Sequence, residues 1–341
     1  RERWQAVHAV RRLIEAGGAA ELRQLISLAD SRVPGAFGCD RYPFYDLHAR
    51  LYLLIAIARV SIEDCRLLYE HANWFRDIAI GNPPHALIRK LAASIALQIE
   101  ESDSGILEDV QVEELMKVGL SPFPMLPSDT PTQSTPWHIS GEVDTSIDLY
   151  VAYDFDRYWF DSIARVFGIP AKQIEDLVKQ TIVQVWGLKP DDAALDDPRD
   201  ELWRSHWGQR ETWHSHGDYP KAEDFRFYVT YHAMMEVADK LLCNMPTIEN
   251  SWDEERWEGW IRRHLITRED GRWVADRRDP PPLETRSWLS EQRTDEWRWQ
   301  IVAEDFLQSL FRERNGETWL VCYGSWNECE SHRSEEFSVY S

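Results

Sequence analysis

The stretch from residue 224 to residue 242 places the strongest constraint on the fold, because it has a helical pattern and is apolar on nearly every side. A helix without a polar face is buried at the centre of its domain, so other elements must surround it. We therefore expect a central helix here. Its large apolar residues are Phe225, Phe227, Tyr228, Tyr231, Met234, Met235, Val237 and Leu241.

Residues 1–118 carry apolar side chains at helical spacing, in segments that break at Gly17-Gly18 and at Pro83-Pro84. These segments recur as pairs about every 40 residues, a period typical of HEAT-like repeats. The sequence predicts a helical-repeat domain over 1–118.

Residues 119–140 contain five prolines and a run of Ser and Thr, a composition that opposes regular structure and predicts a linker. Residues 147–155 have a period of two, with one apolar face and one face that carries Asp148 and Asp154, which predicts a strand. Two more strands are expected at 318–323 and 337–340. The predicted fold is mainly α: an N-terminal HEAT-like stack, then a helix-rich α+β domain with a small sheet over 141–341.

The charge of the chain limits its partners. Asp and Glu number 59 against 38 Lys and Arg, a net charge of −21. Such a surface repels nucleic-acid backbones and anionic membranes, so the expected partners are proteins or small molecules. Its longest apolar run, 51–58, is too short to span a membrane. Five cysteines without a CxxC motif favour a reduced, cytoplasmic protein.

A segment rich in His and Trp, 199–220, precedes the central helix. His214, His216 and Asp218 form an HxHxD step like those of metal-dependent hydrolases, and side chains at i and i+2 share a face of an extended backbone. One alternative is therefore a zinc hydrolase. The other reading is a loop held by histidine hydrogen bonds. Further candidate ligands are His206, His232 and Cys243.

Aromatic and basic residues alternate in the same segment, and Trp and Arg dominate binding hot spots. We predict a binding surface for a protein ligand there. The competing interpretation is that these tryptophans cover the central helix as a lid. The residues of the predicted surface are Trp203, Trp207, Arg210 and Trp213.

Several catalytic motifs are missing from the sequence. It contains no GxxxxGK[ST], no GxGxxG, no GxSxG and no HExxH. No catalytic residue is therefore assigned, and the residues present favour a protein that is not an enzyme.

Six phrases of the sequence resemble the C-terminal region of large bacterial STAND (NACHT-type) NTPases of anti-phage defence. They are RERWQAVHAVRRL (1–13), YPFYDLHARLYLLIAIARV (42–60), DFDRYWF (154–160), RETWHSHGDYP (210–220), DFRFYVTYHAMM (224–235) and GRWVADRRDPPPLE (271–284). The resemblance implies a sensor or scaffold region that follows an effector and an NTPase in one polypeptide. It also implies a protein ligand of phage origin and assembly into an oligomer.

Three hypotheses remain from the sequence. The first is a non-catalytic recognition module that senses a protein ligand. The second is the metal-dependent hydrolase centred on His214, His216 and Asp218. The third is a structural subunit of a larger assembly.

Overall fold

The computed structural model describes residues 2–31, 44–82, 84–132, 143–152, 154–189, 225–250 and 256–265, and the backbone of four strands between 311 and 339. The chain divides into two compact units, Arg1–Asp276 and Arg277–Ser341. The predicted linker at 119–140 thus lies inside the first unit. No helix within the described ranges has the length and apolar character needed to cross a bilayer.

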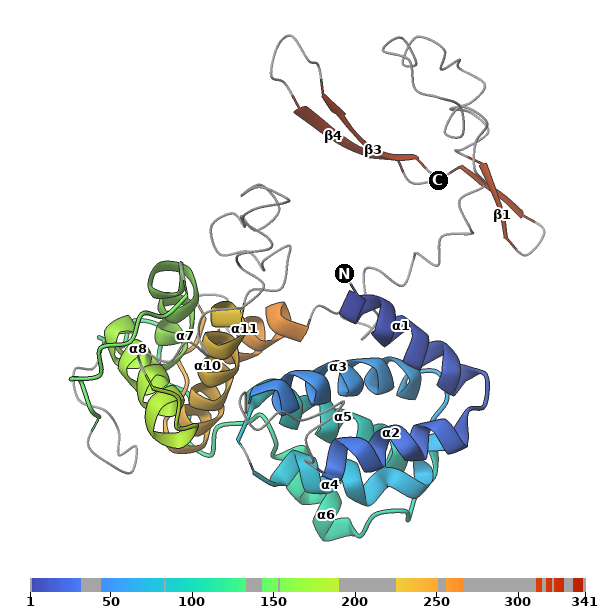
Figure 1. Ribbon diagram of the computed structural model, residues 1–341, viewed down its shortest axis with the longest axis horizontal. Helices are drawn as coiled ribbons and strands as arrows, with labels where there is room; N and C mark the ends of the chain where they lie inside the picture. The colour runs from blue at the N-terminus through green and yellow to red at the C-terminus, as the bar shows by residue number, and fades with distance from the viewer. Residues whose placement is uncertain are drawn as a thin grey trace. The chain divides into compact units, whose positions relative to one another are not determined.

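The described part of the chain is mainly α-helical, as predicted. Its N-terminal helices pack in order, with α1 on α3, α3 on α5, and α4 on both α5 and α6 (Figure 1). A 3-10 turn, η1, leads directly into α4. The bounds are α1 Glu2–Glu15, α2 Ala19–Ser31, α3 Phe44–Ser61, η1 Arg66–His71, α4 Ala72–Ile80, α5 Ala86–Ser102 and α6 Asp109–Met116.

Local capping groups explain several of these boundaries. Gly17 has a φ of 86° after the last turn of α1, a conformation that glycine adopts without strain. His85 precedes α5, and its side chain accepts a hydrogen bond from the Ile88 N–H. Gln111 accepts from the Glu108 N–H at the start of α6, which satisfies a backbone donor at the helix end.

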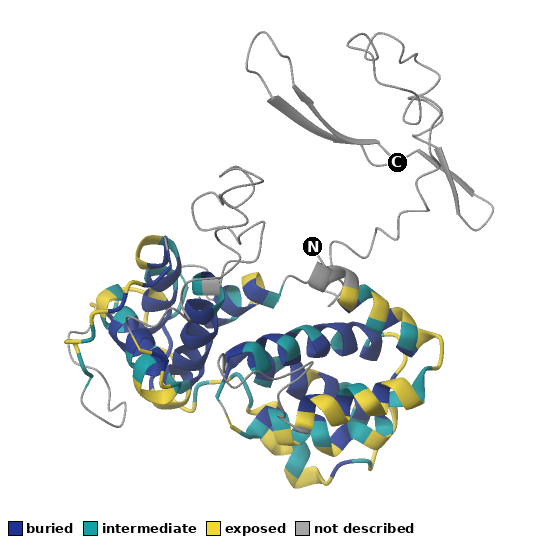
Figure 2. Ribbon diagram, viewed as in Figure 1, coloured by how far each residue is buried: buried dark blue, intermediate teal, exposed yellow. Residues whose placement is uncertain are grey.

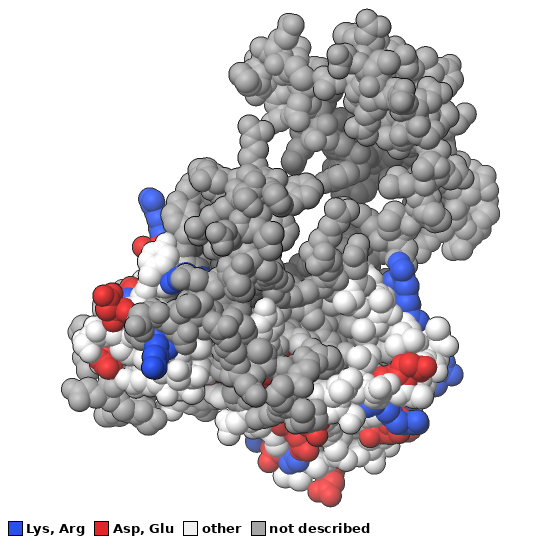
Figure 3. All heavy atoms as spheres, in the orientation of Figure 1, with Lys and Arg blue, Asp and Glu red and all other residues white. Residues whose placement is uncertain are grey.

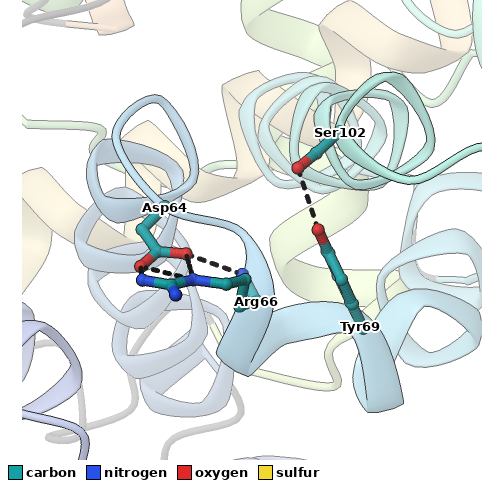
Figure 4. A network of polar contacts seen from close by, with 4 residues as sticks. All are labelled: Asp64, Arg66, Tyr69 and Ser102. Carbon is teal, nitrogen blue, oxygen red and sulfur yellow. Dashed lines mark hydrogen bonds and ion pairs between the residues drawn. The ribbon is translucent and has the colours of Figure 1, made fainter.

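The turn between α3 and η1 is held by short-range polar contacts (Figure 4). Asp64 accepts from both the backbone N–H and the guanidinium of Arg66, and these bonds lower the pKa of Asp64 to about 2. Tyr69 and Ser102 share a hydrogen bond of 2.9 Å that ties η1 to the end of α5. The Asp64–Arg66 ion pair is exposed, so we expect it to contribute little to stability.

The central helix predicted from the sequence is α10, which packs against α3, α5, α7 and α8. Every residue from 231 to 239 is buried, and α10 is dark blue over most of its length in Figure 2. This prediction is confirmed. The bounds of the elements around α10 are η2 Phe155–Trp159, α7 Phe160–Phe167, α8 Ala171–Gln180, η3 Thr181–Val185, α10 Phe225–Asn244 and α11 Arg256–Leu265.

The prediction of a strand at 147–155 is wrong. Leu149 and Val151 are buried and Tyr150 is exposed, so burial alternates over 149–151, but Ala152 is buried as well and the segment pairs with no strand in the described residues. Its backbone bonds to α10 instead. Arg226 donates to the Tyr150 carbonyl at 2.9 Å, and the Ala152 N–H donates to Thr230 Oγ1 at 3.4 Å.

The second unit contains two antiparallel hairpins. β1 (Phe311–Arg314) pairs with β2 (Glu317–Leu320), and β3 (Cys322–Asn327) pairs with β4 (Ser334–Val339). The sequence between β1 and β2 is Asn315-Gly316, a strong signal for a two-residue hairpin. β2 and β3 divide the strand predicted at 318–323, and β4 overlaps the strand predicted at 337–340.

Candidate functional site

A row of polar side chains runs along one side of the otherwise apolar helix α10. His232, Glu236 and Asp239 occupy positions i, i+4 and i+7, a spacing that places them on one face. All three are almost fully buried, with exposed fractions of 0%, 1% and 3%. Polar groups buried this deeply require partners, and we refer to these three residues as the α10 polar row.

His232 connects two other helices through its imidazole ring. Its Nε2 lies 2.7 Å from His48 Nδ1 on α3, and its Nδ1 lies 3.0 Å from His85 Nε2 before α5. His48 and His85 are also buried, at 3% and 0% exposed. Three histidines from distant parts of the sequence therefore form one continuous hydrogen-bonded chain.

The direction of hydrogen-bond donation along these three histidines is set by His85, at the end nearest α5. The Ile88 N–H donates to His85 Nδ1 at 3.3 Å, so the proton of neutral His85 is on Nε2 and points at His232. Neutral His232 then accepts at Nδ1 and donates from Nε2 to His48. Burial lowers the pKa of His85 to about 3, which keeps that ring neutral near pH 7.

Asp239 forms a second connection between α10 and α5. Its Oδ2 lies 2.5 Å from Arg89 Nη1, and the Asp239 side chain is 4% exposed and the Arg89 side chain 18% exposed. Arg89 also donates to the Ala79 carbonyl at 2.6 Å, at the end of α4. Burial raises the pKa of Asp239, and the charge of Arg89 opposes that rise. The pair thus joins three helices.

Glu236 lies between these two connections and has weaker partners. It accepts a hydrogen bond of 3.2 Å from Trp186 Nε1, and Lys240 Nζ is 3.9 Å away. Burial raises the pKa of Glu236 to about 7, although Lys240 and Trp186 favour its charged form. The raised pKa places the Glu236 carboxyl close to its midpoint of ionisation near neutral pH.

Among the predicted metal ligands, His232 is a described residue, and both of its ring nitrogens are engaged by other histidines. A metal ion on His232 would have to replace one of those bonds. Within the described residues, no group of three or more His, Cys, Asp or Glu side chains is placed to hold a metal ion.

The other predicted site residues lie outside the described residues. They are Trp203, His206, Trp207, Arg210, Trp213, His214, His216 and Asp218. Cys243, a further candidate ligand, is exposed near the end of α10, with Arg89 Nη1 4.0 Å from its sulfur.

Sequence reasoning treated α10 as uniformly apolar and missed its polar row. A readable signal existed, because His232, Glu236 and Asp239 recur at spacings of four and three residues, as a helix face requires. Their partners could not be found this way, since His85 and Arg89 belong to a different helix. In comparisons with known proteins, no family model matches the chain and no curated protein is significantly similar to it.

Proposed function

We propose that the chain is a non-catalytic recognition module that binds a protein ligand, as the sensing part of a bacterial anti-phage STAND (NACHT-type) NTPase. One observation carries this proposal. The buried titratable groups of the α10 polar row bond to α3, α5 and the residues beside them, so they connect helices. Such a network suits a scaffold that holds a binding surface in place.

The packing order supports a HEAT-like stack for residues 1–118. In a two-layer helical repeat, each helix packs on the equivalent helix of the next repeat. Here α1 packs on α3 and α3 packs on α5, whereas α4 packs on α5 and α6. We propose three helix pairs in this stack, followed over 141–341 by a helix-rich α+β domain with a small sheet.

The proposed ligand is a protein of phage origin, and the proposed setting is the bacterial cytoplasm, within an oligomer that carries upstream NTPase and effector domains. The net charge of −21 supports a protein ligand over nucleic acid or an anionic membrane. The residues proposed to bind remain Trp203, Trp207, Arg210 and Trp213.

Two substitutions in the full-length protein test this function. We expect Trp207→Ala and Arg210→Ala to abolish NTP hydrolysis triggered by extracts of phage-infected cells, while the melting temperature stays within about 2 °C of wild type. A matched loss of stability and activity in Trp207→Ala would instead identify a structural lid.

Elemental analysis of the same preparation tests the hydrolase alternative. Our proposal predicts no stoichiometric zinc. Bound zinc, with equal destabilisation by His214→Ala, by His216→Ala and by a chelator, would overturn it and establish a metal site.

A further inference from the structure

Exposed apolar side chains are concentrated in one short stretch of the described chain. The described residues include eight large hydrophobic side chains that are exposed, and five of these eight fall between residues 110 and 125. Single exposed hydrophobic residues need no explanation, whereas a concentration of them marks a contact site. These five residues, which we refer to as the 110–125 surface, are Val110 at 58%, Met116 at 63%, Leu120 at 50%, Phe123 at 37% and Met125 at 41% exposed.

The backbone that carries this surface is fixed at three points. The Trp257 indole donates to the Gly119 carbonyl at 2.9 Å, and Ser121 Oγ donates to the Met245 carbonyl at 2.7 Å. Leu126 exchanges hydrogen bonds of 2.8 Å with the Thr247 carbonyl and the Glu249 N–H. Because the backbone is held on both sides of Phe123 and Met125, the exposed side chains are preorganised and a partner need not order them.

Proline placement limits how a partner can bind this segment. Pro122, Pro124 and Pro127 have no N–H to donate, so an added β-strand could not form a regular ladder along it. Recognition must therefore depend on side chains. Met116 extends the apolar contact onto α6. Val110, six positions earlier, lies about 120° away around the helix, with the exposed Glu113 between them.

The exposed charges of residues 100–130 are mostly acidic, although the Lys90 side chain lies close to Gly119. Lys117 is the one exposed basic residue from 100 to 130, and both acidic and basic side chains lie around the region of α6 in Figure 3. Arg76, on α4, lies 3.5 Å from Glu114. The exposed acidic residues in this range are Glu101, Asp103, Glu108, Asp109, Glu113, Glu114 and Asp129.

We propose that the 110–125 surface docks a basic amphipathic helix of the protein ligand. The proposal rests on the proposed recognition function and adds the chemistry of the partner. Apolar residues along one side of such a helix would cover Met116 and Leu120, and its Lys and Arg residues would face the carboxylates. A second copy of this chain would bring the same negative charge against itself, and an anionic membrane is repelled for the same reason.

A designed peptide of about 18 residues serves as the probe, since that length supports a helix when one face is buried. It has Leu at helical spacing and Lys at the remaining positions. Two matched peptides replace either every Lys with Glu or every Leu with Ser. We expect fluorescence anisotropy to show binding of the Leu/Lys peptide to the 341-residue chain, weakened by salt, and no binding of either matched peptide.

Substitutions locate the binding. We expect Met116→Ser with Leu120→Ser to raise the dissociation constant about tenfold. Val185→Ser with Tyr150→Ser is the matched control, because these residues are 61% and 65% exposed elsewhere on the first unit. It should change the dissociation constant by less than about twofold. Glu113→Gln should weaken binding, and Glu21→Gln on α2 should not.

Three results would overturn this proposal: equal binding of the three peptides, equal effects of the two double variants, or self-association of the chain that Met116→Ser abolishes. The last result would identify a second copy as the occupant. The assay requires no NTP hydrolysis, so its outcome is separable from the test of the proposed function. Peptide binding at this surface with unchanged signalling in the Trp207→Ala and Arg210→Ala variants would contradict only the binding residues proposed for 203–213.

Discussion

The α10 polar row and the 110–125 surface depart from the usual placement of side chains in opposite directions. On α10, His232, Glu236 and Asp239 are polar and almost completely buried. Between 110 and 125, Val110 and Met116 are apolar and more than half exposed. Both regions belong to the same compact unit.

The difference between them lies in where each finds its partners. The polar groups of α10 are bonded within the chain, to His48, His85 and Arg89, so their burial is compensated internally. The apolar groups of the 110–125 surface keep their exposure although their backbone is fixed, so they remain available for contact. We therefore associate the first region with stability and the second with binding.

The largest effect is expected at the ion pair of the α10 polar row. Asp239→Leu leaves the mostly buried charge of Arg89 without its carboxylate, and we expect it to lower the free energy of unfolding by about 3–5 kcal/mol. Adding Arg89→Met should restore most of that loss. Urea denaturation measures both changes.

The exposed ion pair of Arg76 with Asp77 is the control for that prediction. Asp77→Leu should cost less than about 1 kcal/mol, because solvent screens this pair. Equal losses in Asp77→Leu and Asp239→Leu would contradict the distinction between buried and exposed polar groups.

A smaller effect is expected from the titration of Glu236. Its pKa is raised to about 7 in the folded chain from 4.5, so the folded state holds this proton more tightly than the unfolded state. Stability from this group is therefore present at low pH and is lost as the pH rises toward 7. We expect wild type to lose about 2 kcal/mol more than Glu236→Gln between pH 5 and pH 8.

Denaturation in urea at several pH values checks this difference. Glu21→Gln, at an exposed position of α2, should keep the wild-type pH dependence. If Glu236→Gln also keeps it, Glu236 is ionised throughout that range and its burial is compensated more fully than we infer.

The smallest effect is expected at the 110–125 surface. Val110→Ser with Met116→Ser should change the free energy of unfolding by less than about 0.5 kcal/mol, since both side chains are mainly exposed. A loss above about 2 kcal/mol would show that they pack within the fold, and the contrast between the two regions would fail.

Much of the helical structure was predictable because its signal is local. The apolar spacing of α3 and α5, the glycines after α1 and the many apolar residues of α10 lie within short windows of sequence. The alternation at 147–152 was equally visible and was misinterpreted as a strand. A period of two reports an extended backbone with one side buried, whether its hydrogen bonds go to a strand or to the side chains of a helix.

The candidate site was less accessible to prediction. His232 was selected from the sequence as a candidate metal ligand, but its contacts with His48 and His85 were not foreseen. Residues 119–132 were predicted to be linker, and the hydrogen bonds that fix Gly119, Ser121 and Leu126 come from residues far along the chain.

The sequence by itself determined the positions of most helices, the central place of α10 and the negative charge, because each depends on composition or on spacing over a few turns. Only the tertiary structure decided which polar groups are paired and which apolar groups stay exposed. His48 and His232 are separated by 184 residues, and no local pattern specifies a hydrogen bond across that distance. Such a bond exists because the packing of α10 against α3 and α5 brings the two rings together and excludes water from between them.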